Sequence, residues 1–208
     1  MDHTTLPDDL PLRHHASEVQ LYRYRISSDV IRNRIVLTHN VISFLRHGEK
    51  EFVGGEHLTV APDQFVAMKA GRCLMTEYTA AGQGQYESLL LFFSAETASR
   101  LLADVDLPVP NQRDQSSYAF DYDPYIRGVV DSLDTLFALA MPDAALARML
   151  EAKLRVLVIY LAERDGPAAV YQALAPIREP HHHMIDVVER HRLVKLSLSD
   201  LAFLSHMS

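Results

Sequence analysis

The sequence predicts an α+β protein, in which an antiparallel β-barrel is followed by an α-helical hairpin and a short C-terminal helical motif. Three observations support this prediction. Short apolar segments alternate with turn residues between positions 19 and 93. Apolar residues then recur at helical spacing between positions 123 and 165. A helix-start signal lies near residue 197. Together these features predict one order of elements, with strands first and helices after them.

Composition limits the classes of protein that the chain can represent. Its 208 residues suffice for one large domain or two small ones. A formal net charge of −7 disfavours non-specific binding of nucleic acid, which needs clustered Lys and Arg. A single cysteine, Cys73, excludes an intrachain disulfide and a Cys-rich zinc site. Because the sequence has neither a membrane-length apolar run nor a signal-peptide core, we expect a cytoplasmic protein with no membrane partner.

The first two segments are predicted to be a flexible N-terminal tail or strap over residues 1–18 and a barrel over 19–110. The tail is rich in proline and polar residues and has few large apolar side chains. Strands at eight- to twelve-residue spacing are typical of a sandwich or small barrel. We expect them at 19–26, 35–37, 41–46, 51–53, 57–60, 64–68, 73–78 and 87–93.

Residues 111–175 are predicted to form a helical region. Before it, Ser94 can cap a short helix. Pro124 occupies a favoured first helical position, and Pro142 separates two helices. The second helix has four leucines at 4-3-4 spacing, as a self-pairing seam would have: Leu150, Leu154, Leu157 and Leu161. Spacing alone leaves open whether they pack against the barrel or against a second copy of the chain.

Residues 176–208 are predicted to be a linker and an incomplete helix-turn-helix. Ser197 and Asp200 have the spacing of a capping box. His206 lies where the chain must reverse, and histidine tolerates a left-handed backbone better than most residues. The residues assigned to this motif are Ser197, Leu198, Leu201, Ala202, Leu204, Met207 and Ser208. We expect Leu198, Leu201, Ala202 and Leu204 to form one buried face.

The closing sequence LSLSDLAFLSHMS resembles the start of the DNA-binding region of AraC/XylS-type transcription regulators. The segments FLRHGEKEF, LTVAPDQFVAMKAGRCLMTE and LLLFF are similar to the cupin-like regulatory barrel of that family. The helical pair at 123–165 resembles its dimerisation helices. The chain is thus identified as a regulatory and dimerisation region that is truncated inside the first helix-turn-helix.

The resemblance implies a homodimer controlled by a small-molecule effector or by a regulatory protein. DNA would be bound only through the missing C-terminal part. Six residues were selected as the lining of a barrel pocket: Phe44, Phe65, Met68, Met75, Tyr78 and Phe92. Side chains often simply fill small barrels, so a filled interior is the alternative. Arg46 and Lys69 are the only charged anchors considered for this pocket.

Two other classes of function stay open as alternatives. The first is a metal-dependent cupin-fold enzyme, although the β-region has only His39, His47 and His57 and lacks the His-x-His pair. The run His181–His183 is a poor ordered chelate, because adjacent side chains on a helix do not share a face. We therefore expect no catalytic residues, no metal and no cofactor. The second alternative is a stand-alone protein-interaction adaptor.

Overall fold

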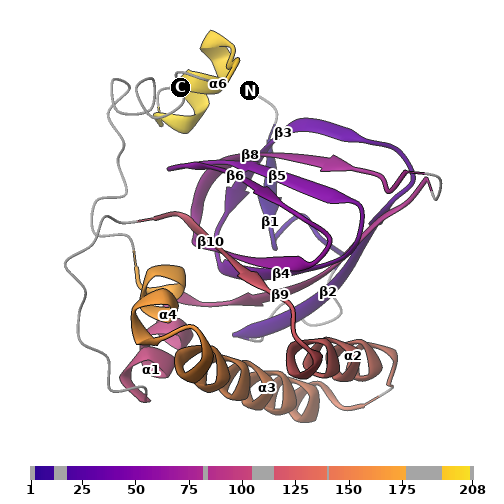
Figure 1. Cartoon of the computed structure of the whole chain (residues 1–208), viewed down its shortest axis with the longest axis vertical. Helices are drawn as coiled ribbons and strands as arrows, with labels where there is room; N and C mark the ends of the chain where they lie inside the picture. Colours follow the sequence, from indigo (N-terminus) through magenta and orange to yellow (C-terminus); the bar gives the residue numbers. More distant parts are fainter. Residues whose placement is uncertain are drawn as a thin grey trace.

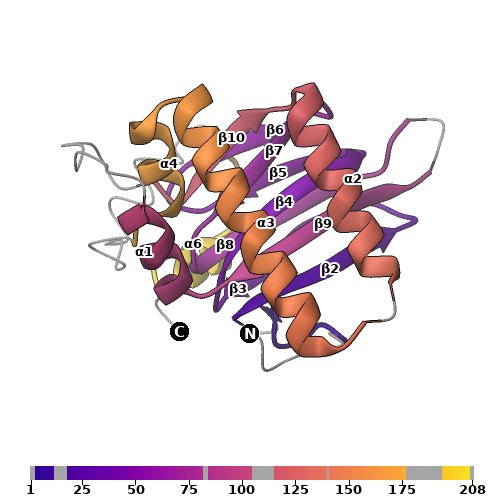
Figure 2. The same cartoon turned by 90° about the horizontal axis from the view of Figure 1, so that it is seen from below.

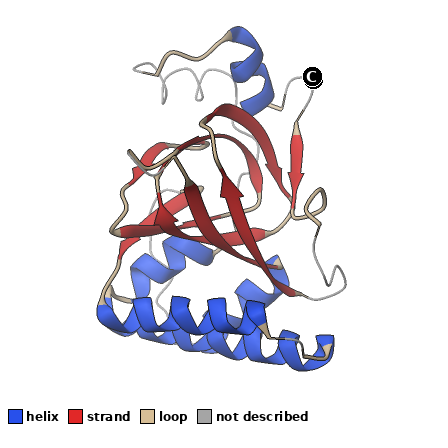
Figure 3. Cartoon of the chain, turned by 90° about the vertical axis from the view of Figure 1, so that its right-hand side faces the viewer, coloured by secondary structure: helices blue, strands red, loops and turns tan. Residues whose placement is uncertain are grey.

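Two five-stranded β-sheets face each other and form a barrel, which confirms the predicted fold class (Figure 1). The computed structural model describes residues 3–11, 18–81, 84–104, 115–139, 141–176 and 194–206. Helices lie on two opposite sides of the barrel (Figure 3). Of the helices that the structure describes, four form a layer on one side, and one short helix near the C-terminus lies on the other.

Sheet A has the strand order β1-β3-β8-β5-β6. Its strands are β1 (Thr4–Leu6), β3 (Val30–Leu37), β8 (Gly71–Tyr78), β5 (Glu49–Val53) and β6 (His57–Val60). Only the β1–β3 pair is parallel; the other neighbours are antiparallel. Sheet B has the order β10-β7-β4-β9-β2 and is antiparallel throughout. Its strands are β10 (Ser117–Asp121), β7 (Gln64–Met68), β4 (Asn40–His47), β9 (Tyr86–Phe93) and β2 (Val19–Ile26).

Sheet B is buried on both faces. In β9, Leu90 and Phe92 join the cluster between the two sheets, whereas Leu89 and Leu91 join the cluster beneath the helices. Successive side chains of a strand point to opposite faces, so both alternating sets of β9 must be apolar. All eight residues of β9 are buried as a result.

Four helices cover the outer face of sheet B (Figure 2). Ser94 caps the first of them, as predicted, since its hydroxyl accepts a hydrogen bond from the Thr97 amide at 3.0 Å. Asp123 caps the second, accepting from the Ile126 amide at 2.8 Å. The helices are α1 (Ala95–Asp104), α2 (Pro124–Ala138), α3 (Asp143–Arg164) and α4 (Pro167–Leu174).

Helix α6 (Leu198–Leu204) lies across the barrel from that layer, against the outer face of sheet A (Figure 3). The predicted capping box is present: the Ser197 hydroxyl accepts from the Asp200 amide at 3.1 Å, and the Asp200 carboxylate accepts from the Ser197 amide at 3.3 Å. His206 has φ 58°, the left-handed conformation expected at the chain reversal. Residues 198–204 of the closing segment are therefore helical.

Two strands lie in segments for which the sequence predicted no strand. Strand β1 lies within the expected tail and pairs with β3, but three residues are too few to show an alternating pattern. Strand β10 lies within the expected helical region, yet it joins sheet B through β7. Helix α4 begins at Pro167 and lies within the predicted helical region, where few strong sequence signals follow residue 166. The interaction with a neighbouring strand, rather than the local sequence, defines β1 and β10.

Candidate functional site

A cavity lies between the two sheets. It offers about 70 Å³ to the centre of a water-sized molecule. By the same measure a single water needs roughly 10–15 Å³, so the space suits a small organic molecule or several waters. Both sheets line the cavity, and so does the N-terminal segment through Leu6 and Leu10. Its wall is mostly apolar.

A buried ion pair forms the most polar part of the cavity wall. Lys50 of β5 and Glu77 of β8 are directly opposite one another in the antiparallel register. The Lys50 Nζ lies 3.2 Å from a carboxylate oxygen of Glu77, and the two side chains are 3% and 8% exposed. Burying two charges is costly unless they are paired. The pair therefore places two compensating charges inside an apolar barrel.

Neighbouring tyrosines shape the electrostatics of this pair. Burial lowers the pKa of Lys50, but Tyr86 and Glu77 more than offset that effect, so the pKa lies above its ordinary value and the ammonium stays charged. Burial, and then the charge of Glu77, raise the pKa of the Tyr24 hydroxyl. Tyr24 is thus a neutral hydroxyl in the cavity wall. The polar end of the cavity carries one positive and one negative group.

The structure brings together three of the six residues predicted to line the pocket. Met68, Met75 and Phe92 do line the cavity. Phe44 and Phe65 lie on the opposite face of sheet B, in the cluster beneath the helices, with their ring centroids 5.3 Å apart. Tyr78 is 38% exposed at the end of β8.

There is a physical reason why Phe44 and Phe65 were predicted on the wrong face of sheet B. Because both faces of sheet B are apolar, alternation along β4 and β7 cannot tell which face points into the barrel. The ion pair was missed because Lys50 lies in a short charged run. A signal was nevertheless present: Glu77 is two residues from Met75 and thus on the same face of β8. Of the two anchors that were considered, Arg46 instead bridges to Asp134 of α2, and Lys69 is not in the lining.

The outer face of sheet A holds α6. Phe203 and Leu204 pack on Val53 and Leu74 in a small buried cluster. One Arg34 amino group lies 2.8 Å from a carboxylate oxygen of Asp200. The guanidinium of Arg72 lies 5.3 Å from the ring centroid of Phe203 and donates a hydrogen bond to its carbonyl oxygen at 3.3 Å.

Asp200 therefore has two roles at this contact. It completes the cap of α6, and it binds the barrel through Arg34. Burial raises its pKa, while Ser197 and Arg34 lower it by more, so the net shift is downward. The carboxylate form is stabilised by the docked arrangement.

The buried face of α6 differs from the predicted one. Leu204 is buried as expected, but Leu198 is 79% exposed, and Leu201 and Ala202 are only partly buried. Phe203, which was not selected, is buried instead. The helix turns the face containing residues 200, 203 and 204 to the barrel, a spacing of i, i+3, i+4. Met207 and Ser208 lie outside the described residues.

Helix α3 has two apolar stripes. The predicted leucines at 150, 154, 157 and 161 are at most 3% exposed and belong to the cluster against sheet B. The prediction that they form a self-pairing seam does not fit this burial. A second stripe, shifted by one or two positions, is exposed: Met149, Ala152, Val156 and Ile159. A groove along α2 and α3 includes the first three of these residues.

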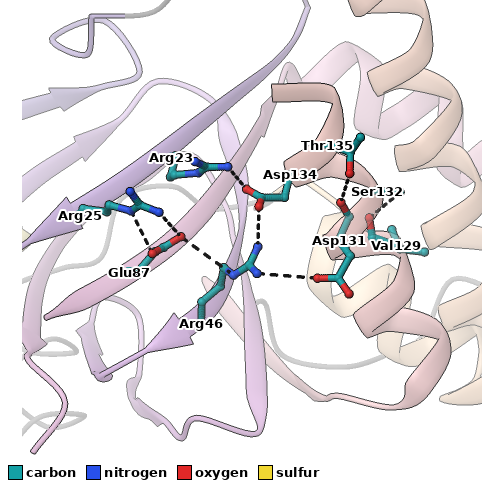
Figure 4. A network of polar contacts seen from close by, with 9 residues as sticks. All are labelled: Arg23, Arg25, Arg46, Glu87, Val129, Asp131, Ser132, Asp134 and Thr135. Carbon is teal, nitrogen blue, oxygen red and sulfur yellow. Dashed lines mark hydrogen bonds and ion pairs between the residues drawn. The ribbon is translucent and has the colours of Figure 1, made fainter. Parts of the chain in front are cut away.

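A cluster of charged residues fastens α2 to the end of the barrel (Figure 4). Asp134 of α2 pairs with Arg23 of β2 and with Arg46 of β4, the latter at 3.2 Å. Glu87 of β9 accepts two hydrogen bonds from Arg25, at 2.9 and 3.2 Å. Three arginines and three carboxylates, counting Asp131, thus join sheet B to the helical layer.

The histidines of the β-region do not line the cavity. His57 pairs with Glu51 at 2.6 Å, and His39 lies 3.1 Å from the Thr38 hydroxyl. In the described ranges, no three His, Cys, Asp or Glu side chains are grouped as metal ligands. Burial raises the pKa of the Cys73 thiol. The run at 181–183 lies outside the described residues.

Known proteins resemble this chain in sequence family and in fold. A family model of the ExsA N-terminal regulatory domain matches residues 40–172. None of the curated protein sequences matches the chain. An apo variant of ToxT from Vibrio cholerae is similar in structure, with a TM-score of 0.60 and 8% identity over 91% of this chain and 71% of ToxT. Wild-type ToxT bound to an unsaturated fatty acid gives a TM-score of 0.53 and 8% identity over 92% and 70%.

The solved structures establish the fold, and the family model identifies the chain. No helix among the described residues has the length and apolar character that a membrane span requires. The match to the family model includes strands of both sheets and all of α1 to α3, more than half of the chain. This chain belongs to the family of ExsA N-terminal regulatory domains, the regulatory part of AraC-type transcription regulators.

Proposed function

We propose that the chain is the sensing and dimerising half of a cytoplasmic DNA-binding regulator. An effector occupies the cavity between the sheets, and a second copy of the chain covers the exposed stripe of α3. DNA is contacted through helix-turn-helix elements of which α6 is the first. The barrel binds its effector with different affinities in two arrangements of the helix-turn-helix elements. This difference is needed because a ligand shifts an equilibrium only through differential affinity.

One observation carries this proposal: the same strands serve the cavity and α6 on opposite faces. In β3, Ile35 lines the cavity while Arg34 binds Asp200. In β8, Met75 lines the cavity while Leu74 packs on α6. Because neighbouring residues in a strand point to opposite faces, a shift of β3 or β8 that accommodates a ligand also moves the surface on which α6 rests.

The structures of ToxT support a ligand-binding role for the barrel. ToxT is bound to an unsaturated fatty acid in one structure and to (E)-4-(8-methylnaphthalen-1-yl)but-3-enoic acid in another. For this chain, the apolar wall with a few convergent polar groups is typical of a small-molecule site.

The exposed stripe of α3 supports a homodimer. Met149, Val156 and Ile159 are 41–47% exposed although they are large and apolar. Their spacing, with Ala152 between them, follows the 3-4-3 pattern of a helix–helix seam. The inner leucines hold α3 on the barrel, so only the outer stripe is free to meet a partner helix.

Sedimentation equilibrium tests this proposal. We expect the unmodified chain to be a dimer, and Ile159→Asp to be a monomer with an unchanged circular dichroism spectrum, because a charge on the seam must lose its water on association. Ala168→Asp is the matched control, an exposed alanine on α4 outside the stripe, and should stay dimeric. A monomeric unmodified chain would refute the dimer, and a dimeric Ile159→Asp variant would refute its assignment to the exposed stripe of α3.

A further inference from the structure

We propose that the barrel cavity selects an uncharged ligand, with a small apolar body and one end group that both donates and accepts a hydrogen bond. A hydroxyl or a primary amide has this chemistry, whereas a carboxylate does not. This inference rests on the proposed effector role of the cavity and specifies which class of effector the cavity takes. The Lys50–Glu77 pair is the feature that decides the class.

The wall of the cavity requires an apolar body. Large apolar side chains from both sheets dominate it, including Leu37, Met75, Leu90 and Phe92. A polar chain lying against these residues would lose hydrogen bonds to water and gain none. An alkyl or aryl body loses nothing comparable, and its burial is favourable.

The ion pair excludes a charged end group. A carboxylate beside Lys50 would also lie beside Glu77, because the paired atoms of these two residues are only 3.2 Å apart. It cannot donate a hydrogen bond to Glu77, and it would repel that group in a site where both side chains are more than nine-tenths buried. An ammonium would meet the corresponding repulsion from Lys50.

A neutral donor–acceptor group satisfies both partners at once. Lys50 offers only donors and Glu77 only acceptors while they are charged. A hydroxyl can accept from the ammonium and donate to the carboxylate, so it inserts without leaving either charge unpaired. Hydrogen bonds to charged groups are stronger than those between neutral groups. The ion pair therefore favours the binding of a hydroxyl or a primary amide over that of a charged end group.

A bulge in strand β3 places a further polar side chain, that of Asn33, in the cavity wall. Strand β3 shifts register between Val30 and Asn33. Arg32 within this bulge has φ 51°, in the left-handed region that non-glycine residues rarely occupy. Its amide donates to the Thr76 hydroxyl at 3.1 Å. Bulges re-aim side chains, and the next residue, Asn33, lines the cavity with an amide that can both donate and accept.

Three probes of equal length test the ligand class: hexan-1-ol, hexanoate and hexan-1-amine at pH 7. Binding is measured by calorimetry and by the methyl NMR signals of Met68 and Met75, which line the cavity. Met149, exposed on α3, is the internal control and should not respond. We expect hexan-1-ol to shift both cavity methionines and to bind at least tenfold more tightly than either charged probe.

Two variants and a control assign the selectivity to the ion pair. Glu77→Gln leaves Lys50 uncompensated, so hexanoate should overtake hexan-1-ol. Because an unpaired buried charge can prevent folding, the double variant Lys50→Met/Glu77→Met removes both charges. Its affinity for hexan-1-ol should fall at least tenfold. Glu51→Gln lies on the same strand but pairs with His57 outside the cavity, so it should bind as the unmodified chain does.

Each contrary outcome has a defined meaning. Hexanoate binding as tightly as hexan-1-ol, or unchanged hexan-1-ol affinity in the double variant, overturns the ligand class. A cavity that responds to none of the probes also overturns it. Sedimentation measures the dimer, and hydrogen exchange measures the docking of α6. A monomeric chain or an undocked α6 would therefore count against the proposed function itself, independently of the ligand class.

Discussion

The outer faces of the two sheets are covered in very different ways. Sheet B lies beneath four helices, with a continuous apolar cluster that runs from the strands into α1, α2, α3 and α4. Within the described ranges, sheet A is met by helix α6, through a cluster with four buried residues: Val53, Leu74, Phe203 and Leu204. Polar contacts from Arg34 and Arg72 complete that small interface.

This contrast predicts that the helical layer is attached to the barrel more stably than α6 is. Apolar burial scales with area, so removing the helical layer from sheet B would expose a core, whereas removing α6 would expose a small patch. Helix α6 has seven residues, too few for stability in isolation. Its structure and its docking on sheet A are therefore expected to be lost together, without loss of the barrel.

The largest effect should come from the buried stripe of α3. Leu154 is fully buried against sheet B. Leu154→Ala should lower the free energy of unfolding by about 2–5 kcal/mol, because it leaves a cavity in the core. Chemical denaturation measures this loss. Arg148→Ala, exposed on the same helix and outside both stripes, is the control and should change stability by less than about 0.5 kcal/mol. Equal losses in the two variants would contradict the burial of the leucine stripe against sheet B.

An intermediate effect is expected at the cap of α2. Asp123 accepts hydrogen bonds from the Ile126 amide, the Tyr160 hydroxyl and Arg164, each at 2.7–2.8 Å. Burial alone would raise the pKa of Asp123, but these hydrogen bonds lower it to about 2 from 3.8. Asp123→Ala should therefore cost about 1–2 kcal/mol near neutral pH.

The pH dependence of that cost follows from the lowered pKa. The folded state binds the Asp123 proton less tightly than the unfolded state does, so the stabilisation is complete above about pH 4. It should disappear as the pH falls towards 2. Urea denaturation of both proteins across this range is the measurement. A difference that stays constant down to pH 2 would show that the carboxylate charge does not contribute.

The smallest change in global stability should accompany undocking of α6. Phe203→Ala removes the main apolar contact of α6 with sheet A. We expect the amides of α6 to lose protection from hydrogen exchange, while the free energy of unfolding of the barrel changes by less than about 1 kcal/mol. Phe120→Ala is a contrasting variant, since Phe120 lies in the large cluster beneath the helices. If both variants destabilise the whole barrel equally, α6 is an integral part of the core.

The sequence predicted the strands and capped helices well, because their signals are local. Eight predicted strands overlap with β2 to β9, the caps at Ser94 and Ser197 form as expected, and α2 begins at Pro124 as expected. Strands β1 and β10 lacked such signals, since each depends on a strand distant in sequence: β3 for β1, and β7 for β10.

The site was less predictable than the fold. Phe44 and Met68 are both apolar, sheet-borne and fully buried, yet only Met68 faces the cavity. The choice between faces depends on which side the helices cover, and the strands alone do not encode it. The Lys50–Glu77 pair required the register between β5 and β8. Helix α3 likewise has two apolar stripes, and the contact with sheet B determines which of them is buried.

The pairing of β1 with β3 has a practical consequence. Without residues 4–6, β3 would become the open edge of sheet A, with unpaired backbone groups that can recruit another chain. Leu6 and Leu10 would also leave the cavity wall. Trimming the first eleven residues to ease purification or crystallisation would therefore invite self-association and alter the ligand site, whereas an affinity tag placed ahead of Met1 leaves both intact.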